Sequence, residues 1–263
     1  MKLLKVYYAY FSPGNSTETV LSEITRAFHD YPVEAINLTN YDSRNMEYHF
    51  KENELVIIGS PVYGGRLPVP VTEALSRFSG INTPAVLVAT YGNGDIGDTV
   101  TELSNVVSEK GFIPVAAATF VCQHTYLSEC GQGRPDENDL ETAREFGEKL
   151  RDRLRLMITY DVKKLDLPGS YPYAKPPMTR FPFNVETNDY CIYCMLCAGI
   201  CPVKAVSESN PKSIDNDKCV RCGSCLRICP TQAKYFTEEP FRALQKKLAP
   251  LCDIHKEPWY TIG

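Results

Sequence analysis

The sequence lacks the features that mark membrane, secreted and nucleic-acid-binding proteins. Among its 263 residues, no apolar run approaches the length that crosses a bilayer. The first residues, MKLLKVYYAYFSPGN, contain neither the long apolar segment nor the small-residue cleavage site of a signal peptide. The net charge is only −4, with no basic stripe suited to nucleic acid. These absences favour a soluble, cytoplasmic protein.

Residue patterns typical of hydrolytic enzymes and of histidine-based metal sites are also missing. The four histidines are scattered without metal-ligand spacing, and the chain shows no paired carboxylates and no Ser–His–Asp arrangement. Hydrophobic residues nevertheless make up 43% of the chain, which is enough for a packed core. The length suits one domain of ordinary size together with a smaller one.

Cysteine is the exception to this scarcity. Eight of the 11 cysteines form two copies of the pattern C-x2-C-x2-C-x3-C-P, and 28 residues separate Cys191 from Cys219, the first cysteine of each copy. A fixed period of this kind indicates an internal duplication. In a reducing compartment the pattern indicates metal binding rather than disulfides, and thiolates are soft ligands that suit iron–sulfur clusters. A zinc ribbon is the alternative, but a zinc site would leave the third cysteine of each run without a role.

The spacing also predicts how the cysteines are shared. Three cysteines of one run wrap one cluster, and the fourth reaches the other cluster. The first [4Fe–4S] cluster is therefore assigned to Cys191, Cys194, Cys197 and Cys229, and the second to Cys219, Cys222, Cys225 and Cys201. Ala205 and Ala233, each four residues after the last cysteine of a run, are expected to pack close to a cluster. Residues 186–236 thus resemble bacterial two-cluster 4Fe–4S ferredoxins, which are small α+β domains.

The longer upstream segment alternates between two patterns. Apolar runs predict strands at residues 2–11, 32–38 and 112–121, and a strand followed by a loop at residues 54–64 and again at 84–95. Helical periodicity and helix-start signals predict helices at residues 16–31, 69–80, 99–112 and 135–157. Nearly continuous apolar strands that alternate with helices predict a doubly wound parallel α/β sheet.

In such sheets, ligands bind beyond the carboxyl ends of the strands. The loop after the first strand opens a helix, and its hydroxyls and backbone amides suit a phosphate. It has no lysine of the P-loop type, which favours a monophosphate over a magnesium-bound triphosphate. The loops after the third and fourth strands are Gly-rich and carry one tyrosine each, so they suit the two sides of a flat ring. The candidate residues are Ser12, Gly14, Asn15, Ser16 and Thr17; Ser60, Pro61, Val62, Tyr63, Gly64 and Gly65; and Thr90, Tyr91, Gly92, Asn93, Gly94 and Asp95.

With three loops in this order, residues 1–158 resemble a flavodoxin. The resemblance implies a five-stranded sheet of order 2-1-3-4-5, with the FMN phosphate in the first loop and the isoalloxazine between the other two. The first loop departs from the form Phe-Ser-Pro-Thr-Gly-Thr-Thr of many flavodoxin-like proteins. Gly14 stands at the threonine and Asn15 at the glycine, although asparagine tolerates the left-handed conformation better than most residues. Arg66 is expected either near the flavin or in solvent.

The whole chain resembles the flavodoxin–ferredoxin fusion family found in many anaerobes. The expected parts are a flavodoxin-like domain at 1–158, a connector at 159–185, a ferredoxin domain at 186–236 and a C-terminal extension at 237–263. The Pro-rich and aromatic connector is predicted to pack along a surface and to fix the clusters against the flavin. Residues 238–251 are predicted to contain a short helix.

Three functions are compatible with FMN and two [4Fe–4S] clusters. An electron carrier between redox partner proteins is favoured, because residues 1–158 hold 21 acidic and 14 basic side chains and so suit a basic partner. A reductase acting on a quinone, a nitro compound or another flavin is the alternative. A redox-sensing or partner-binding protein is the third. Cys122, Cys130 and Cys252 lie outside the runs, and Cys122 is either paired with His124 as a nucleophile or is, with Cys130, an ordinary loop thiol.

Overall fold

The computed structural model describes residues 3–157 and 164–263. The boundary expected between the first domain and the connector, at residues 158 and 159, lies outside the described residues. In the part of the chain that is described, no helix has the length and apolar character needed to span a membrane.

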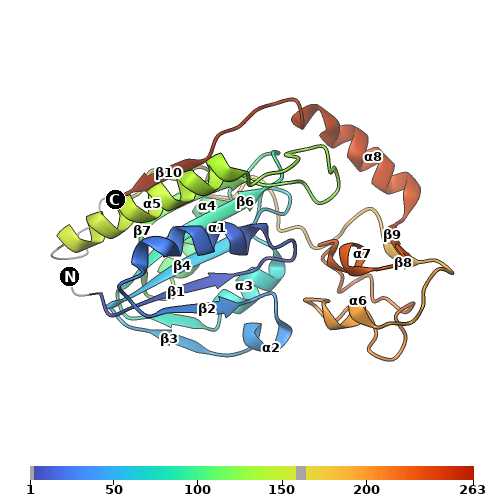
Figure 1. Ribbon diagram of the computed structural model, residues 1–263, viewed down its shortest axis with the longest axis horizontal. Helices are drawn as coiled ribbons and strands as arrows, with labels where there is room; N and C mark the ends of the chain where they lie inside the picture. Colours follow the sequence, from blue (N-terminus) through green and yellow to red (C-terminus); the bar gives the residue numbers. More distant parts are fainter. Residues whose placement is uncertain (1–2, 158–163) are drawn as a thin grey trace.

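A six-stranded sheet forms the centre of the larger domain (Figure 1), in the order β10-β7-β6-β4-β1-β2. Its strands are β1 (Lys5–Tyr10), β2 (Val33–Asn37), β4 (Glu54–Pro61), β6 (Thr83–Tyr91), β7 (Phe112–Val121) and β10 (Trp259–Ile262). The first five are parallel, and in chain order they have the 2-1-3-4-5 arrangement that the flavodoxin resemblance implied. The sixth strand was not expected: β10 pairs antiparallel with β7, so the end of the chain returns to cover the sheet edge.

Helices cover both faces of this sheet, because the strand side chains are buried on both sides. On one face α1 (Ser16–Thr25), the short helix η1 (Arg26–Phe28) and α5 (Glu137–Leu156) pack together. On the other face lie α3 (Val69–Leu75) and α4 (Thr99–Ser108). α2 (Tyr41–Arg44) follows β2.

A small second sheet corrects one predicted helix. Residues 69–80 were expected to be helical throughout, but α3 ends at Leu75, and β5 (Phe78–Gly80) pairs with β3 (Tyr48–Phe50). Phe78 packs against Phe50, with 5.4 Å between the ring centroids, so an aromatic contact distant in sequence outweighs the helical pattern.

The connector packs along the larger domain, as its composition predicted. Leu165 and Leu167 join the core cluster on the α4 face. The Asp98 carboxylate accepts hydrogen bonds from the backbone amides of Ser170 (2.8 Å) and Ala174 (2.7 Å). The connector is therefore fixed to the domain by apolar packing and by hydrogen bonds to one carboxylate.

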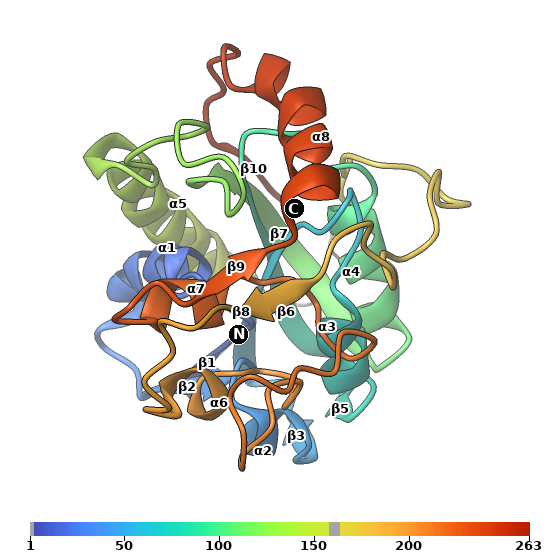
Figure 2. The same ribbon diagram turned by 90° about the vertical axis from the view of Figure 1, so that its right-hand side faces the viewer.

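The cysteine-rich domain lies beyond the carboxyl end of the parallel strands, and Figure 2 views it from that side. It contains an antiparallel pair, β8 (Val185–Thr187) with β9 (Lys234–Phe236), and two short helices, α6 (Leu196–Gly199) and α7 (Ser224–Ile228). α8 (Glu238–Leu248), followed by the short helix η2 (Ala249–Leu251), confirms the helix predicted at residues 238–251. Phe241 of α8 packs on Phe183 and Phe236 in the core of this domain.

Candidate functional site

The two cysteine runs have duplicated backbones as well as duplicated sequences. Three pairs of positions, each 28 residues apart, share the left-handed conformation. They are Tyr193 and Arg221 (φ 56° and 55°), Met195 and Gly223 (62° and 73°), and Lys204 and Gln232 (49° and 53°). Only one of these six residues is glycine, so the conformation is imposed by the loop and stabilised by its surroundings.

Each run contributes three cysteines to one cavity and one cysteine to the other. A cavity of about 300 Å³ is lined by the sulfur-bearing residues Cys191, Cys194, Cys197 and Cys229. A second cavity, of about 350 Å³, is lined by Cys201, Cys219, Cys222 and Cys225. The structure thus brings together the same two sets of four cysteines that the spacing assigned to two clusters. Across residues 3–157 and 164–263, no three His, Cys, Asp or Glu side chains are grouped to hold a single metal ion.

The fourth cysteine of each run is held by a backbone hydrogen bond. The amide of Ala205 donates to Cys201 Sγ and that of Ala233 donates to Cys229 Sγ, both at 3.2 Å. Each alanine lines the cavity of the cysteine it contacts, where the sequence placed a small residue. Burial raises the pKa of Cys225 to about 12, so its thiol is neutral unless a cation such as iron lies beside it.

The first predicted loop is shaped to bind an anion. Asn15 adopts φ 66° at the position where the sequence required the left-handed conformation, and it precedes the ten-residue helix α1. Ser12 orders the loop, because its amide donates to Thr39 Oγ1 (2.6 Å) and its hydroxyl accepts from the amide of Glu18 (3.0 Å). Among the described residues, the amides of Gly14, Ser16 and Thr17 have no acceptor, and such a turn of free N–H groups fits a phosphate.

The three predicted loops are joined to one another. Thr17 Oγ1 lies 2.7 Å from Thr90 Oγ1, which links the first loop to the third. The amide of Val62 donates to the Thr90 carbonyl at 3.0 Å, which links the second loop to the third. Gly65 and Gly97 meet backbone to backbone, and a Cβ on Gly97 would lie 2.5 Å from the Gly65 oxygen. Glycine is therefore required where these two loops touch.

The two tyrosines have separate environments. Tyr63 is within electrostatic range of Cys222, Tyr126 and Arg227, and burial raises its pKa. Tyr91 lies instead beside Cys122 and Arg134, and the Lys256 ammonium is 5.6 Å from its ring centroid. Of the two rings predicted to flank a flat ligand, Tyr63 is the one within electrostatic range of the cysteine-rich domain.

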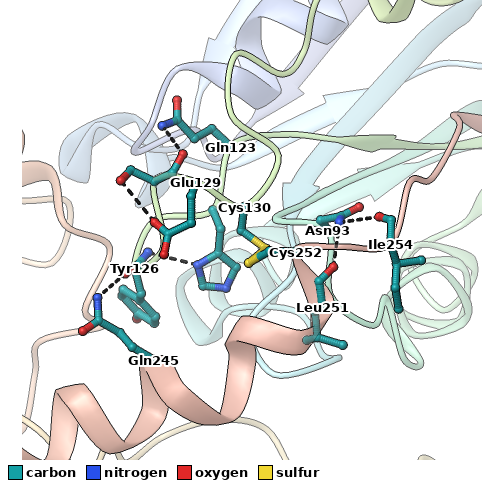
Figure 3. Close-up of a disulfide and its surroundings, with 11 residues drawn as sticks. Asn93, Gln123, Tyr126, Glu129, Cys130, Gln245, Leu251, Cys252 and Ile254 are labelled. Carbon is teal, nitrogen blue, oxygen red and sulfur yellow. Dashed lines mark hydrogen bonds between the residues drawn. A yellow bond between two sulfur atoms is a disulfide. The ribbon is translucent and has the colours of Figure 1, made fainter.

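A C-terminal segment, residues 251–254, covers the third loop. The sequence alone did not predict this contact. Asn93 Nδ2 donates to the carbonyls of Leu251 (2.8 Å) and Ile254 (2.7 Å), as Figure 3 shows. The same view shows the disulfide between Cys130 and Cys252, which anchors this segment to the loop after β7. Cys130 is therefore not an ordinary loop thiol. The only signal in the sequence was that Cys130 and Cys252, together with Cys122, remained outside the cluster pattern.

Cys122 and His124 do not form a nucleophile pair. The Cys122 thiol is buried near the Ser16 hydroxyl, and burial raises its pKa to about 12. His124 Nδ1 accepts a hydrogen bond from the amide of Tyr126 at 3.0 Å, and burial lowers its pKa. A neutral buried thiol beside a neutral imidazole that is already engaged matches the ordinary-thiol interpretation.

Arg66 is not in solvent, which was one of the two positions expected for it. Its side chain is buried, and it donates to both carboxylate oxygens of Glu102, at 2.8 and 2.7 Å. It also donates to the Lys175 carbonyl, and its guanidinium carbon lies 4.2 Å from the Tyr173 ring centroid. Arg66 therefore ties the second loop to α4 and to the connector.

The cysteine-rich domain contacts the larger domain through its second run and through Pro202, the last residue of the first run. Ser224 Oγ donates to the Pro13 carbonyl of the first loop at 2.9 Å. The hydroxyl of Tyr126 donates to the Arg221 carbonyl at 2.9 Å, and the buried Arg44 donates to the Pro202 carbonyl. Ser224 and Pro202 both line the second cavity, which therefore lies against the anion-binding loop.

Comparison with known proteins finds one family model and a set of solved structures. The family model of the 4Fe-4S binding domain matches residues 186–207 and 212–235. Among solved structures, a flavodoxin from the domain Archaea has 14% identity and a TM-score of 0.43, covering 58% of this chain and 99% of its own. Oxidised flavodoxin 2 from Bacillus cereus has 16% identity and a TM-score of 0.42, covering 57% and 99%. The Flv1 flavodiiron core from Synechocystis has 20% identity and a TM-score of 0.41, covering 59% and 36%. No curated protein sequence matches the chain.

The matched family model shows a 4Fe-4S binding domain in the second part of the chain, and the sheet order shows a flavodoxin-like fold in the first. The chain thus joins a first domain with the strand order of the flavodoxin fold to a 4Fe-4S binding domain that follows it.

Proposed function

We propose that the protein carries electrons between FMN, held by the three loops of the larger domain, and two [4Fe–4S] clusters, held by the eight cysteines. It would thereby link redox partner proteins. When bound, FMN exchanges one or two electrons and each cluster exchanges one, so the pair converts between paired and single electrons. The supporting observation is that Ser224, which lines the second cysteine cavity, donates a hydrogen bond to the anion-binding loop.

Different residues of the chain would hold the two clusters and the FMN. Cys191, Cys194, Cys197 and Cys229 would hold one cluster, and Cys219, Cys222, Cys225 and Cys201 the other. The free amides of Gly14, Ser16 and Thr17 would receive the FMN phosphate. Tyr63, on the second loop and within electrostatic range of Cys222, would lie between the flavin and the nearer cluster. The amides of Ala205 and Ala233 stabilise negative charge on the sulfur that each contacts, which tunes the potential of a cluster.

A groove favours the reductase as the second candidate. It lies between the loop after β2 and the helix α6, and it is lined by Tyr41 and Asp42 from one domain and by Met195, Cys201 and Lys204 from the other. A small acceptor bound there would lie against a cluster ligand. The covering of Asn93 by the C-terminal segment argues for the carrier, because it restricts access to the third loop.

An anaerobic reconstitution tests the proposal. The purified chain is loaded with iron, sulfide and FMN, and the bound iron and flavin are counted. Two clusters and one FMN per chain are expected, with the magnetic interaction of two neighbouring reduced clusters in the EPR spectrum. A chain that takes up both clusters but no flavin would refute the role given to the three loops. Rapid, saturable reduction of a quinone or a nitro compound by the reduced protein would favour the reductase.

A further inference from the structure

Arg227 reaches from the cysteine-rich domain to the anion-binding loop of the other domain. It lies on α7, and its Nη2 donates to the Pro13 carbonyl at 2.8 Å. The same Nη2 donates to the carbonyl of Cys222 at 3.1 Å. The guanidinium thus touches both the loop that carries a cluster cysteine and the loop that is shaped for a phosphate.

The anion-binding loop has no cation of its own. Residues 12–17 contain no Lys or Arg, and the charged residue in the first turn of α1 is Glu18, which is acidic and accepts a hydrogen bond from the Tyr10 hydroxyl at 2.7 Å. A phosphate monoester carries a charge of about −1.5 to −2 at neutral pH. Backbone amides offer only partial positive charge to such a group. A full positive charge beside the loop would therefore add to the affinity for a phosphate.

Arg227 is placed to supply that charge. Its Nη2 lies 3.7 Å from the position that a Cβ would take on Gly14, so the guanidinium is within van der Waals reach of this part of the loop. In the described part of the chain, Nη2 makes the hydrogen bonds of this guanidinium, while Nε and Nη1 have no acceptor. Arginine presents its donors in a planar fork that suits phosphate oxygens.

We propose that Arg227 is a phosphate-binding residue supplied by the cluster domain to the cofactor of the flavodoxin-like domain. This inference rests on the proposed function, because the phosphate is that of FMN. Its consequence is that one side chain couples two events. Retention of the cofactor depends on the cluster domain being docked, and the cofactor phosphate in turn helps to hold the Cys222 loop against the larger domain.

The test compares FMN with riboflavin, which has the same ring system but no phosphate. The cluster-loaded protein is depleted of flavin, and the dissociation constant of each flavin is measured from the quenching of flavin fluorescence at low and high salt. Arg227→Gln is compared with the unsubstituted protein. Arg242→Gln is the matched control, because Arg242 is an exposed arginine of α8 whose ion-pair partner is Glu238.

Arg227→Gln is expected to weaken FMN binding about tenfold, the effect of losing one charge-assisted hydrogen bond. Riboflavin binding is expected to be unchanged, and the salt dependence of FMN binding is expected to fall. Arg227→Lys is expected to restore part of the FMN preference, and Arg242→Gln to change neither flavin. The readout is the ratio of the two dissociation constants, which a merely structural role of Arg227 would not alter.

The outcomes separate this inference from the function on which it rests. If Arg227→Gln weakens FMN and riboflavin equally, or leaves the FMN preference intact, Arg227 is not a phosphate ligand and the proposed function stands. If the unsubstituted, cluster-loaded protein binds neither flavin, the proposed function fails and the role of Arg227 fails with it.

Discussion

The substitution Glu102→Gln tests how the second loop and the connector are held. Glu102 accepts three hydrogen bonds, two from Arg66 at 2.8 and 2.7 Å and one from the amide of Leu67 at 2.9 Å. The side chains of Arg66 and Glu102 are only 6% and 5% exposed, so the pair is shielded from water. The glutamine keeps the size of the side chain but replaces one acceptor oxygen by a donor that faces the guanidinium.

The expected loss of stability follows from the burial of this pair. Removing one partner of a buried ion pair costs about 3–5 kcal/mol, because the other charge stays buried without compensation. Arg66 would keep the Lys175 carbonyl and the Tyr173 ring, and the glutamine would keep one oxygen acceptor. We therefore expect a loss near the lower end, about 3 kcal/mol. That is a large fraction of the 5–15 kcal/mol typical of a folded domain.

Trp259 provides the probe for this measurement. It is the single tryptophan of the chain, it lies on the edge strand β10 of the larger domain, and it is 37% exposed. Urea unfolding followed by its fluorescence therefore reports on the domain that contains Glu102. The control is Glu145→Gln, whose partner Lys149 is exposed and whose loss should cost less than about 0.5 kcal/mol. If Glu102→Gln destabilised the domain no more than this control, the buried pair would not hold the loop.

Three further substitutions probe other parts of the chain. Cys252→Ser removes a disulfide whose cysteines are 122 residues apart in sequence. From the chain entropy of so long a loop, the free energy of unfolding should fall by up to about 5 kcal/mol. A thiol reductant should then lower the melting temperature of the unsubstituted protein but not that of the variant. Backbone hydrogen bonds from Ser170 and Ala174 lower the pKa of Asp98 from its ordinary value of 3.8. Its stabilising effect is therefore complete above pH 3.8 and is lost as the pH falls through the lower folded pKa. Proteolysis of the connector should accelerate in that acidic range with an acid-tolerant protease, and Asp98→Asn should show fast cleavage at neutral pH as well. Cys229→Ser, although it lies in the second run, should abolish the EPR signal of the cluster held by the first run, and loss of the other signal instead would refute the crossed assignment.

The parts of the fold that the sequence predicted are those encoded in local patterns. The five parallel strands are apolar runs long enough to be recognised individually, and their alternation with helices defines the sheet class. β10 has only four residues, Trp259–Ile262, and it pairs with a strand that ends at Val121. Neither its length nor its pattern distinguishes it from a loop, so its place in the sheet depends on a contact distant in the sequence.

In the candidate site, too, some features are encoded locally and others depend on contacts distant in the sequence. The cysteine sets follow from spacing, because a short loop places its sulfur atoms with little help from the rest of the chain. The environments of Asn93 and Arg66 depend instead on residues 251–254 of the C-terminal segment and on Glu102 of α4. Such partners are selected by tertiary packing, and no local pattern identifies them.

The duplicated cysteine runs are symmetric in sequence but are used asymmetrically in the fold. Among the described residues that line the first cavity, none makes a hydrogen bond to the larger domain, whereas Pro202 and Ser224 of the second cavity both do. Exposed aromatic and aliphatic side chains lie at the start of the first run and just before it, with Tyr190 at 75% and Ile192 at 62% exposed. Under the proposed function, electrons would pass between the flavin loops and the second cluster, and the first cluster would be the one that partners approach. Under the same proposal, the duplication would provide two similar clusters, and the hydrogen bond from Ser224 to the Pro13 carbonyl would place the second of them nearer to the flavin.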